Sequence, residues 1–402
     1  MPWRERTVSG EREAFVLLAV MPGANVSELC RRFGISRSNG FKWLKRYKEG
    51  GLAGLESLSR RPLSSPSRTG PAVETKILDV RSGSNEAWGG RKIAHVLKRE
   101  GLAECPSAST ITEVLRRNGR LAERAHEHPG PHRRFEHGEP NDLWQMDFKG
   151  HIATARGRCH PLTVLDDHSR YSIGVRACGD ERDATVREQL TAMFRVHGLP
   201  WRMLADNGSP WGDSGAQTYT AFGVWLMRLD IRLSHGKPYH PQTQGKDERF
   251  HRTLKAEVLT GRAFADLADC QAAFDPWRRK YNHERPHQAI GMAVPADRYR
   301  LGSRSFPEVL PPIEYADGDA VRIVSTEGFI SFKGKQWRIG KAFRGLPVAL
   351  RPSGQDGIFD LRLRNHALGR INFVTGAREA RGLVDEEEAS TTTPPAQQRQ
   401  EI

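Results

Sequence analysis

Cysteine is scarce in this sequence: there are five among 402 residues, and no two form a CxxC pair. A disulfide framework or a cysteine-based zinc site is therefore not expected, and the isolated thiols fit a reducing, cytoplasmic setting. No apolar run reaches the roughly 20 residues that span a bilayer, and the N-terminus does not have the pattern of a signal peptide. We expect no membrane partner.

Acidic residues are also under-represented. The chain carries 62 Lys and Arg against 48 Asp and Glu, a net charge of +14. Most of the excess lies in residues 1–137, which hold 25 Lys and Arg and 15 Asp and Glu. A soluble basic surface is the plainer interpretation, but so large an imbalance favours a polyanionic partner, with nucleic acid as the leading candidate.

Residues 1–56 are predicted to form a helix-turn-helix DNA-binding domain. Ser27 is expected to cap a helix through Phe33, and Ser36 to cap a basic helix over 37–48 after a turn at Gly34. A basic helix after a glycine turn is typical of this motif and can enter a major groove. A plain helical bundle with a basic surface is the alternative. The predicted DNA contacts of the basic helix are Arg37, Asn39, Lys42, Lys45 and Arg46.

Residues 73–123 repeat the pattern after a Ser/Pro/Arg-rich linker at 57–72. One helix is expected to open at 88–97 and another at 106–117, the second capped by Ser107 or Ser109. This second helix-turn-helix domain adds Arg91, Lys92 and Ser109 as predicted DNA contacts. Residues 124–140 are rich in His, Arg, Pro and Gly. They indicate another linker rather than a metal site, because the histidines have no cysteine partner.

From residue 141 to 300 the pattern predicts strands and helices of an α/β domain. Three consecutive antiparallel strands are expected at 143–152, 159–166 and 171–177. The order that follows is a helix at 183–197, a strand at 201–205, a helix at 218–229, a strand at 231–234 and helices at 243–260 and 266–282. Such an order predicts a mixed sheet flanked by helices.

The C-terminal part has short strands punctuated by glycine over 311–378, which predicts a small β-barrel. Residues 384–402 are acidic and then rich in Thr, Pro and Gln, which is typical of a disordered tail. The expected fold class is therefore multidomain, with all-α tandem helix-turn-helix units, a central α/β core and a C-terminal small β-barrel.

Three acidic residues stand in different settings of the predicted α/β domain. Asp147 lies within an apolar strand, Asp206 ends another before Asn-Gly, and Glu248 lies on the helix at 243–260. Carboxylates so placed can converge on two divalent cations, which prefer oxygen ligands and can support phosphodiester attack. In this arrangement Asp147 bridges both ions, and Asp206 and Glu248 each complete the coordination of one.

Each acidic residue also has a plainer interpretation. Asp-Asn-Gly is usually a turn, and an aspartate in a strand is often an edge residue. Asp166 and Asp167 are rival carboxylates, but the residues around them predict a turn between two strands. On the helix of Glu248, Arg252 and Lys255 share its face, and their positive charge suits a phosphate backbone.

Several segments of residues 141–300 occur in a fixed order: 144–147, 165–170, 206–208, 238–250, 281–287 and 295–299. Together they resemble the integrase catalytic core of DDE transposases from bacterial insertion sequences, relatives of retroviral integrases. The tandem helix-turn-helix units match the same transposases. The resemblance implies an RNase H-like fold, two Mg²⁺ ions with Mn²⁺ as the substitute, DNA cleavage at element ends and transfer of the 3′-hydroxyl into target DNA.

The resemblance also implies residues and partners. The catalytic and metal-binding trio falls on Asp147, Asp206 and Glu248, and DNA contacts fall on Gln244, Arg252 and Lys255. The expected partners are terminal inverted repeats, target DNA and further copies of the chain assembled on that DNA. The expected location is the bacterial cytoplasm in association with the nucleoid.

Two features depart from the family pattern. Asp206 and Glu248 are 42 positions apart, longer than is common, with the extra residues expected in a loop over 211–217. The zinc-binding N-terminal domain of retroviral integrases is absent, and helix-turn-helix units stand in its place. Two alternatives stay open: a DNA-binding regulator or domesticated integrase with an inactive core, and an RNase H-like nuclease without strand transfer.

Overall fold

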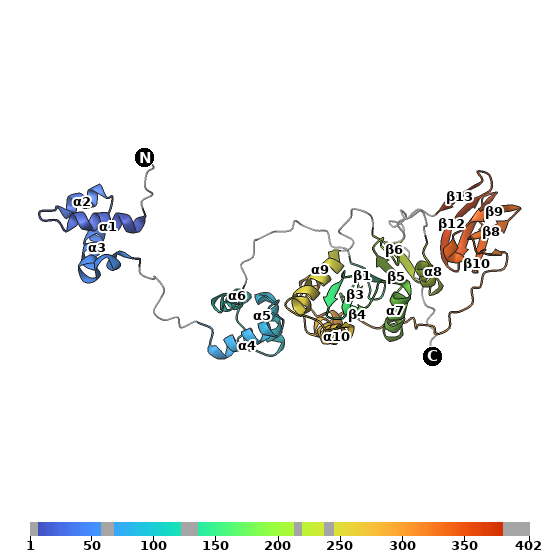
Figure 1. Ribbon diagram of the computed structural model, residues 1–402, viewed down its shortest axis with the longest axis horizontal. Helices are drawn as coiled ribbons and strands as arrows, with labels where there is room; N and C mark the ends of the chain where they lie inside the picture. Colours follow the sequence, from blue (N-terminus) through green and yellow to red (C-terminus); the bar gives the residue numbers. More distant parts are fainter. Residues whose placement is uncertain (1–6, 58–67, 122–135, 213–218, 237–244, 381–402) are drawn as a thin grey trace. The chain divides into compact units, whose positions relative to one another are not determined.

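The computed structural model describes residues 7–57, 68–121, 136–212, 219–236 and 245–380 (Figure 1). The expected tail at 384–402, Gln244 and most of the two expected linkers lie outside these residues. The chain divides into two compact units, residues 1–68 and 69–402. In the described parts of both units, no helix is long and apolar enough to cross a membrane.

The first unit is built from three helices around a small core. Phe15, Val16, Cys30, Leu44 and Leu55 are buried in it. The elements are α1 (Val8–Ala19), α2 (Val26–Arg32), α3 (Arg37–Gly50) and the 3₁₀ turn η1 (Gly51–Leu55). Their arrangement confirms the predicted helix, turn and basic helix.

The helix caps of this unit were only partly predicted. Ser36 caps α3 as expected, accepting a hydrogen bond from the backbone N–H of Asn39. The prediction for α2 was wrong, because Asn25 caps it and accepts from the N–H groups of Ser27 and Glu28. Asparagine is as good an N-cap as serine, and here it lies two residues earlier, so the helix starts sooner.

The second unit begins with another three-helix domain, formed by α4 (Pro71–Ser82), α5 (Gly90–Arg99) and α6 (Ala108–Arg117). Ser107 caps α6, which is one of the two caps predicted for it. Gly90 lies where α5 crosses α6, and a Cβ atom there would collide with the carbonyl oxygen of Ala108 and the hydroxyl of Thr112. The crossing therefore depends on glycine at this position.

The central domain contains the predicted mixed sheet. Its strand order is β2-β3-β1-β5-β6, and β4 pairs with β3. The pairs β1–β3, β2–β3 and β3–β4 are antiparallel, whereas β1–β5 and β5–β6 are parallel. The strands are β1 (Leu143–Phe148), β2 (Ile152–Thr154), β3 (Gly157–Asp166), β4 (Ser172–Cys178), β5 (Arg202–Ala205) and β6 (Arg232–His235).

Helices cover both faces of this sheet (Figure 1). Alternation along β3 sends Leu162 and Val164 into the core with α7 and α8, and Leu165 into the core with α9 and α10. The helices are α7 (Asp183–His197), α8 (Ala221–Arg228), α9 (Gly245–Leu254) and α10 (Leu267–His283), with the π-helical η3 (Lys255–Leu259) directly after α9. Residues 288–290 and 295–297 form short 3₁₀ turns, η4 and η5.

The C-terminal strands do not confirm a closed barrel. They form an open five-stranded sheet, β13-β12-β11-β10-β7, and a separate β8–β9 hairpin. The hairpin buries Ile330, Phe332 and Trp337 against the sheet, so side-chain packing closes the core without strand pairing. The strands are β7 (Ala320–Ile323), β8 (Phe329–Phe332), β9 (Lys335–Arg338), β10 (Pro347–Pro352), β11 (Ile358–Leu363), β12 (His366–Asn372) and β13 (Ala377–Ala380).

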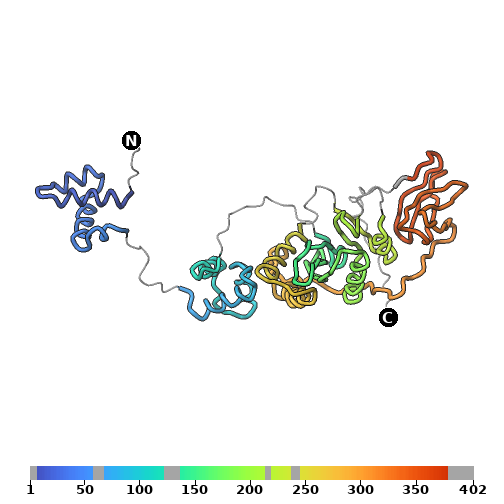
Figure 2. The backbone as a smooth tube through the Cα atoms, viewed as in Figure 1, coloured from blue at the N-terminus to red at the C-terminus, as the bar shows by residue number. Residues whose placement is uncertain are grey.

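The connection into the C-terminal sheet is long and irregular. Residues 299–319 contain no helix or strand, as the backbone path shows (Figure 2). The core of the C-terminal sheet nevertheless includes Val224 of α8, and Arg364 and Asn365 bind the carboxylate of Asp230, which follows α8. Side chains of the central domain therefore contribute to the C-terminal core.

Candidate active site and nucleic-acid interface

Asp147 lies near the end of β1, paired with Thr163 of β3. The Thr163 hydroxyl donates to the backbone carbonyl of Asp147 at 2.9 Å. The single hydroxyl proton is thereby used, so the 2.8 Å contact between Thr163 Oγ1 and His251 Nε2 requires the histidine to donate. Nδ1 of His251 is then unprotonated and faces Asp147 Oδ2 at 3.7 Å. The chain holds Asp147 from its backbone and leaves its carboxylate oxygens for other ligands.

The carboxyl group of Asp147 is in an environment that disfavours its charge. Burial, followed by the negative charge of Asp206, raises the pKa of Asp147 to about 7. The side chain nevertheless keeps 26% of its exposure, so its carboxylate is reachable. A cation placed beside the two aspartates would relieve both effects.

Asp206 directly follows β5, the parallel neighbour of β1. The register pairs Leu143 with Arg202 and Gln145 with Leu204, and continuing it by two residues brings Asp206 beside Asp147. Asp206 Oδ1 accepts a 2.9 Å hydrogen bond from the Gly208 N–H, which forms the expected Asp-Asn-Gly turn. The indole N–H of Trp211 donates to the same oxygen. One oxygen of Asp206 is thus fixed by the following loop.

Glu248 lies in the first turn of α9, where two adjacent acids point in different directions. Asp247 is buried, and Glu248 is exposed. Complete burial, followed by the charges of Asp147 and Asp167, raises the pKa of Asp247 well above its ordinary value. Arg252 and Lys255 are exposed like Glu248, one and two turns further along the chain.

The three predicted carboxylates do not meet in one cluster. Among the described ranges, no three His, Cys, Asp or Glu side chains lie close enough to hold a metal ion. The structure pairs Asp147 with Asp206 through the register of β1 and β5, and it presents Glu248 on the surface of a neighbouring helix. The donor set still suits Mg²⁺, because all three side chains supply oxygen and the surroundings of Asp147 disfavour its negative charge.

Asp166 and Asp167 have structural roles, in agreement with the predicted turn. Asp166 accepts from the backbone N–H groups of Asn141 and Ser169 and from the Ser169 hydroxyl. Asp167 accepts from the His137 N–H and the Gln145 amide, and it pairs with the ammonium group of Lys246. Their oxygens hold the β3–β4 turn to its neighbours.

Four residues around the trio were not predicted: Thr163, Trp211, Asp247 and His251. The sequence offered a partial indication of His251. It lies three residues after Glu248, and residues at this spacing are neighbours on the surface of a helix. No comparable signal marks Thr163 or Trp211, since each reaches the site through strand register or a loop.

Most predicted contacts on α3 are on the surface. Arg37, Asn39, Lys42 and Lys45 are exposed, which suits a groove-binding helix. Arg46 is different: its guanidinium lies 4.8 Å from the centre of the Trp43 ring and donates to the carbonyl of Glu56. Arg46 therefore also stabilises the domain.

In the second helix-turn-helix domain, the predicted DNA contacts differ in their exposure. Arg91 and Ser109 are exposed. Lys92 is half-buried, and burial followed by the charge of Arg285 lowers its pKa to about 7. A DNA phosphate would stabilise the charged form of Lys92, but the free chain disfavours it.

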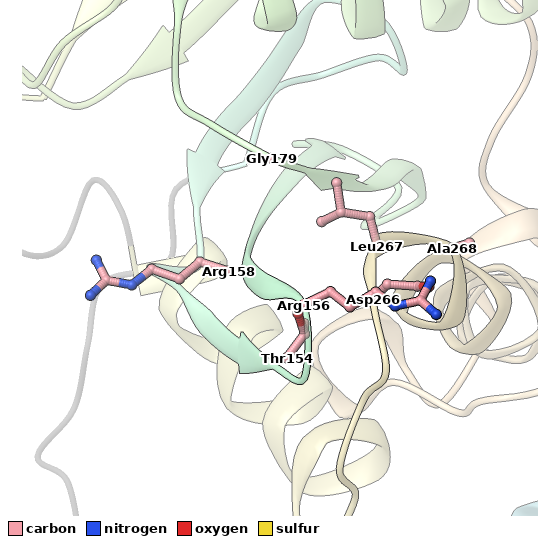
Figure 3. Close-up of a pocket in the computed structure, with 7 residues that line it drawn as sticks. All are labelled: Thr154, Arg156, Arg158, Gly179, Asp266, Leu267 and Ala268. Carbon is pink, nitrogen blue, oxygen red and sulfur yellow. The ribbon is translucent and has the colours of Figure 1, made fainter.

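A surface hollow of about 440 Å³ lies between the β2–β3 turn and the start of α10 (Figure 3). Thr154, Arg156, Arg158 and Asp266 are among its lining residues. Arg156 is already paired with Asp266 at 3.1 Å. None of the trio lines this hollow, so it is separate from the carboxylates.

Comparisons with protein families agree with this architecture. Residues 137–241 and 229–295 match descriptions of an integrase core domain, and residues 319–378 match the C-terminal domain of IS481 family transposases. Residues 11–62 match a helix-turn-helix domain, and residues 40–115 match a homeodomain-like domain.

Curated relatives come from insertion elements. An uncharacterized 39.2 kDa protein of IS476 from Xanthomonas euvesicatoria is 31% identical over 157 residues, which are 39% of this chain and 44% of that protein. An uncharacterized 31.7 kDa protein of IS407 from Burkholderia multivorans is 24% identical and covers 60% of this chain and 87% of its own length. The match thus spans less than half of the first relative.

A solved structure shows a more distant likeness. The intasome of simian T-cell lymphotropic virus, in complex with PP2A regulatory subunit B56 gamma, has a chain with a TM-score of 0.35 and 17% identity. The match covers 72% of this chain and 97% of that chain. The likeness is too weak to carry conclusions about the site.

Proposed function

We propose that this chain, a member of the insertion-sequence transposases with an integrase-type core, cleaves DNA at element ends and joins the 3′-hydroxyl to target DNA. One observation carries the proposal. The parallel register of β1 and β5 brings Asp147 beside Asp206, where burial and mutual repulsion raise the pKa of Asp147 to about 7. A carboxyl group whose pKa is raised by burial and by a neighbouring carboxylate is typical of a functional site, and a divalent cation would offset the repulsion between the two.

Asp147, Asp206 and Glu248 are the residues that would hold divalent metal, with Mg²⁺ as the first choice and Mn²⁺ as its substitute. Two such ions, when bound, activate the attacking oxygen and stabilise charge on the leaving oxygen of a phosphodiester. The Thr163 hydroxyl, itself bonded to His251, fixes the backbone of Asp147, while Trp211 and Gly208 fix one oxygen of Asp206. These contacts preorganise the ligands.

The remaining roles concern DNA. Arg252 and Lys255 are exposed beyond Glu248 and supply positive charge to the phosphate backbone. Gln244 is proposed as a further contact. The two helix-turn-helix domains would bind terminal inverted repeats, and several copies of the chain would assemble on the paired ends. Activity on DNA places the protein with the bacterial nucleoid in the cytoplasm.

The adjacent acids Asp247 and Glu248 provide a sharp test. Glu248→Gln should lower Mg²⁺-dependent joining of inverted-repeat DNA by about 10³-fold or more, because a metal ligand is lost. Asp247→Asn should retain activity, since burial disfavours the charged form of that carboxyl and Asn keeps the size of the side chain. Joining is measured on labelled oligonucleotides at matched protein–DNA occupancy. Equal loss in both variants, or joining that survives in Glu248→Gln, would contradict the assignment of Glu248.

A DNA-binding regulator or domesticated integrase with an inactive core is the second candidate. It is favoured by the lack of a three-residue metal cluster among the described residues. Under this alternative the unaltered chain binds inverted repeats but yields neither cut nor joined product with Mg²⁺ or Mn²⁺. Cut ends without joined product would instead indicate an RNase H-like nuclease.

A further inference from the structure

Glu257 is a buried carboxylate with three donors. Its side chain keeps only 5% of its exposure. Oε1 accepts from the indole N–H of Trp88 at 3.0 Å and from Arg285 Nε at 2.9 Å, and Oε2 accepts from the indole N–H of Trp277 at 2.9 Å. Because three donors from three different segments bind its two oxygens, Glu257 is held in a single orientation.

The two tryptophans belong to different hydrophobic cores. Trp88 is 2% exposed and packs with the second helix-turn-helix domain, in a core that includes Ile93 and Leu115. Trp277 of α10 packs with Phe250 of α9 in the central domain. Each indole is fixed by its own core, and both N–H groups converge on one carboxylate. Glu257 therefore links the two cores directly.

Further contacts surround this link. The ammonium group of Lys280 lies 5.1 Å from the centre of the Trp88 ring and donates to the carbonyl of Gly83. The side-chain amide of Asn85 donates to the carbonyl of Ala256 at 3.1 Å, and Arg99 donates to the carbonyl of His283. These polar contacts bring the segment 83–88 onto η3 and α10.

Glu257 also lies close in sequence to the proposed active site. It is in η3, the π-helical segment that directly continues α9, and α9 carries Glu248. Single-turn π-helical insertions are rare and frequently lie at functional sites. Because α9 and η3 are continuous, a displacement of η3 would be transmitted to the helix of Glu248.

We propose that Glu257 is a positioning residue that fixes the second helix-turn-helix domain to the helix of Glu248. DNA bound by that domain then reaches the active site in one register, so that cleavage falls at one position. The link itself rests on the contacts of Glu257, whereas its effect on cleavage rests on the proposed function. Neither the family matches nor the helix-turn-helix pattern assigns Glu257 a role.

The first experiment measures hydrogen exchange in the full chain without DNA. In Glu257→Gln, the acceptor shared by Trp88 and Arg285 loses its negative charge and the other oxygen becomes an amide donor, so exchange across residues 83–88 should be about tenfold faster or more. Trp88→Phe should have the same effect, since it removes the N–H and keeps an aromatic ring. Trp277→Phe is the matched control: it removes an equivalent N–H from the same carboxylate but within the central domain, and should leave 83–88 unchanged.

The double variant of Trp88→Phe and Glu257→Gln distinguishes loss of the contact between Trp88 and Glu257 from general destabilisation of the domain. If the two residues act through one contact, the double variant should exchange at 83–88 no faster than Glu257→Gln alone. Unchanged exchange at 83–88 in Glu257→Gln would overturn the proposal. So would additive effects in the double variant, because additivity means that Trp88 acts only in its own core.

The second experiment maps the cleavage position on inverted-repeat DNA. Glu257→Gln should keep its affinity for that DNA but scatter the cuts over neighbouring nucleotides and lower kcat more than it raises KM. Trp277→Phe should cut at the wild-type position. A single unshifted cut in Glu257→Gln would overturn the positioning role. A wild-type chain that never cuts would sink the proposed function and leave the exchange result standing.

Discussion

The surroundings of Asp147 in the sheet disfavour a negative charge on its side chain. Its ordinary pKa of 3.8 rises to about 7 because the side chain is largely buried and Asp206 lies nearby. The folded chain therefore binds a proton more tightly than the unfolded chain does. It follows that stability falls as pH rises from about 4 through 7, and that the full penalty is present above pH 7.

Asp147→Asn should remove this penalty. The variant should be more stable than the wild type at pH 8, by up to about 4 kcal/mol at 1.4 kcal/mol per pKa unit, and nearly equal to it below about pH 4. Thermal unfolding at the two pH values measures the difference. Mg²⁺ should raise the Tm of the wild type at pH 8 and leave that of Asp147→Asn unchanged. A stability difference that is the same at both pH values would refute this account.

The candidate trio could be chosen from sequence because each member sits at the end or start of a regular element with recognisable neighbours. Sequence could not show that Asp147 is partly buried or that Trp211 binds Asp206, since both depend on tertiary packing. Nor could it show that Glu248 points outward while Asp247 points inward. That choice depends on which side of α9 faces the sheet.

At the scale of elements, Gly90 determines how closely α5 and α6 pack. A methyl group there would collide with the Ala108 carbonyl and the Thr112 hydroxyl, whereas neighbouring Gly89 has open space at its Cβ position. Gly90→Ala should therefore destabilise the second helix-turn-helix domain by about 1–3 kcal/mol through overpacking. Gly89→Ala should be close to neutral. Chemical denaturation followed by circular dichroism tests both, and equal effects would argue against the close crossing.

Helices and strands of the central domain were predicted almost residue by residue where their periodicity is strong, as for α7 at 183–197. The helix ends that depend on an N-cap residue were predicted less accurately. Asn25 and Ser27 are both good N-caps, and the choice between them depends on which side chain reaches the free N–H groups. The predicted strand at 143–152 is two strands, β1 and β2, because residues 149–151, with Gly150 at positive φ, interrupt the pairing with β3.

At the scale of the whole molecule, positive charge should dominate DNA binding. With a net charge of +14 concentrated toward the N-terminal domains, specific binding should weaken steeply with salt. A complex with roughly 6–10 phosphate contacts loses about 10³–10⁵ in affinity between 50 and 200 mM salt. Lys45→Ala should lower the slope of log K against log salt by about 1 if Lys45 binds a phosphate.

Asn39→Ala is the matched control for the salt experiment. Asn39 is exposed on the same helix as Lys45 but carries no charge, so its loss should weaken binding to inverted repeats without changing the salt slope. Fluorescence anisotropy across a salt series gives both quantities. Binding that hardly changes with salt would contradict an electrostatic interface.

In the C-terminal region, the sequence pattern does not determine how the strands pair. Alternating short strands predict a closed barrel and an open sheet with a packed hairpin equally well, because both bury the same alternate side chains. Phe332 and Trp337 enter the core from the hairpin rather than from a strand paired into the sheet. The hydrophobic pattern thus determines which residues are buried, and the strand pairing depends on tertiary contacts.

The bond between Trp88 and Glu257 has a consequence for the order of events during synthesis. The two residues are 169 positions apart in the chain. At typical translation rates of 5–20 residues per second, about 10–30 s pass between the emergence of Trp88 and that of Glu257. Once residue 117 has emerged, both helix-turn-helix domains are complete, and for most of that interval α9 and α10 have not yet been synthesised. Under the proposed function, a nascent chain would therefore be able to bind DNA before it contains the helix that carries Glu248.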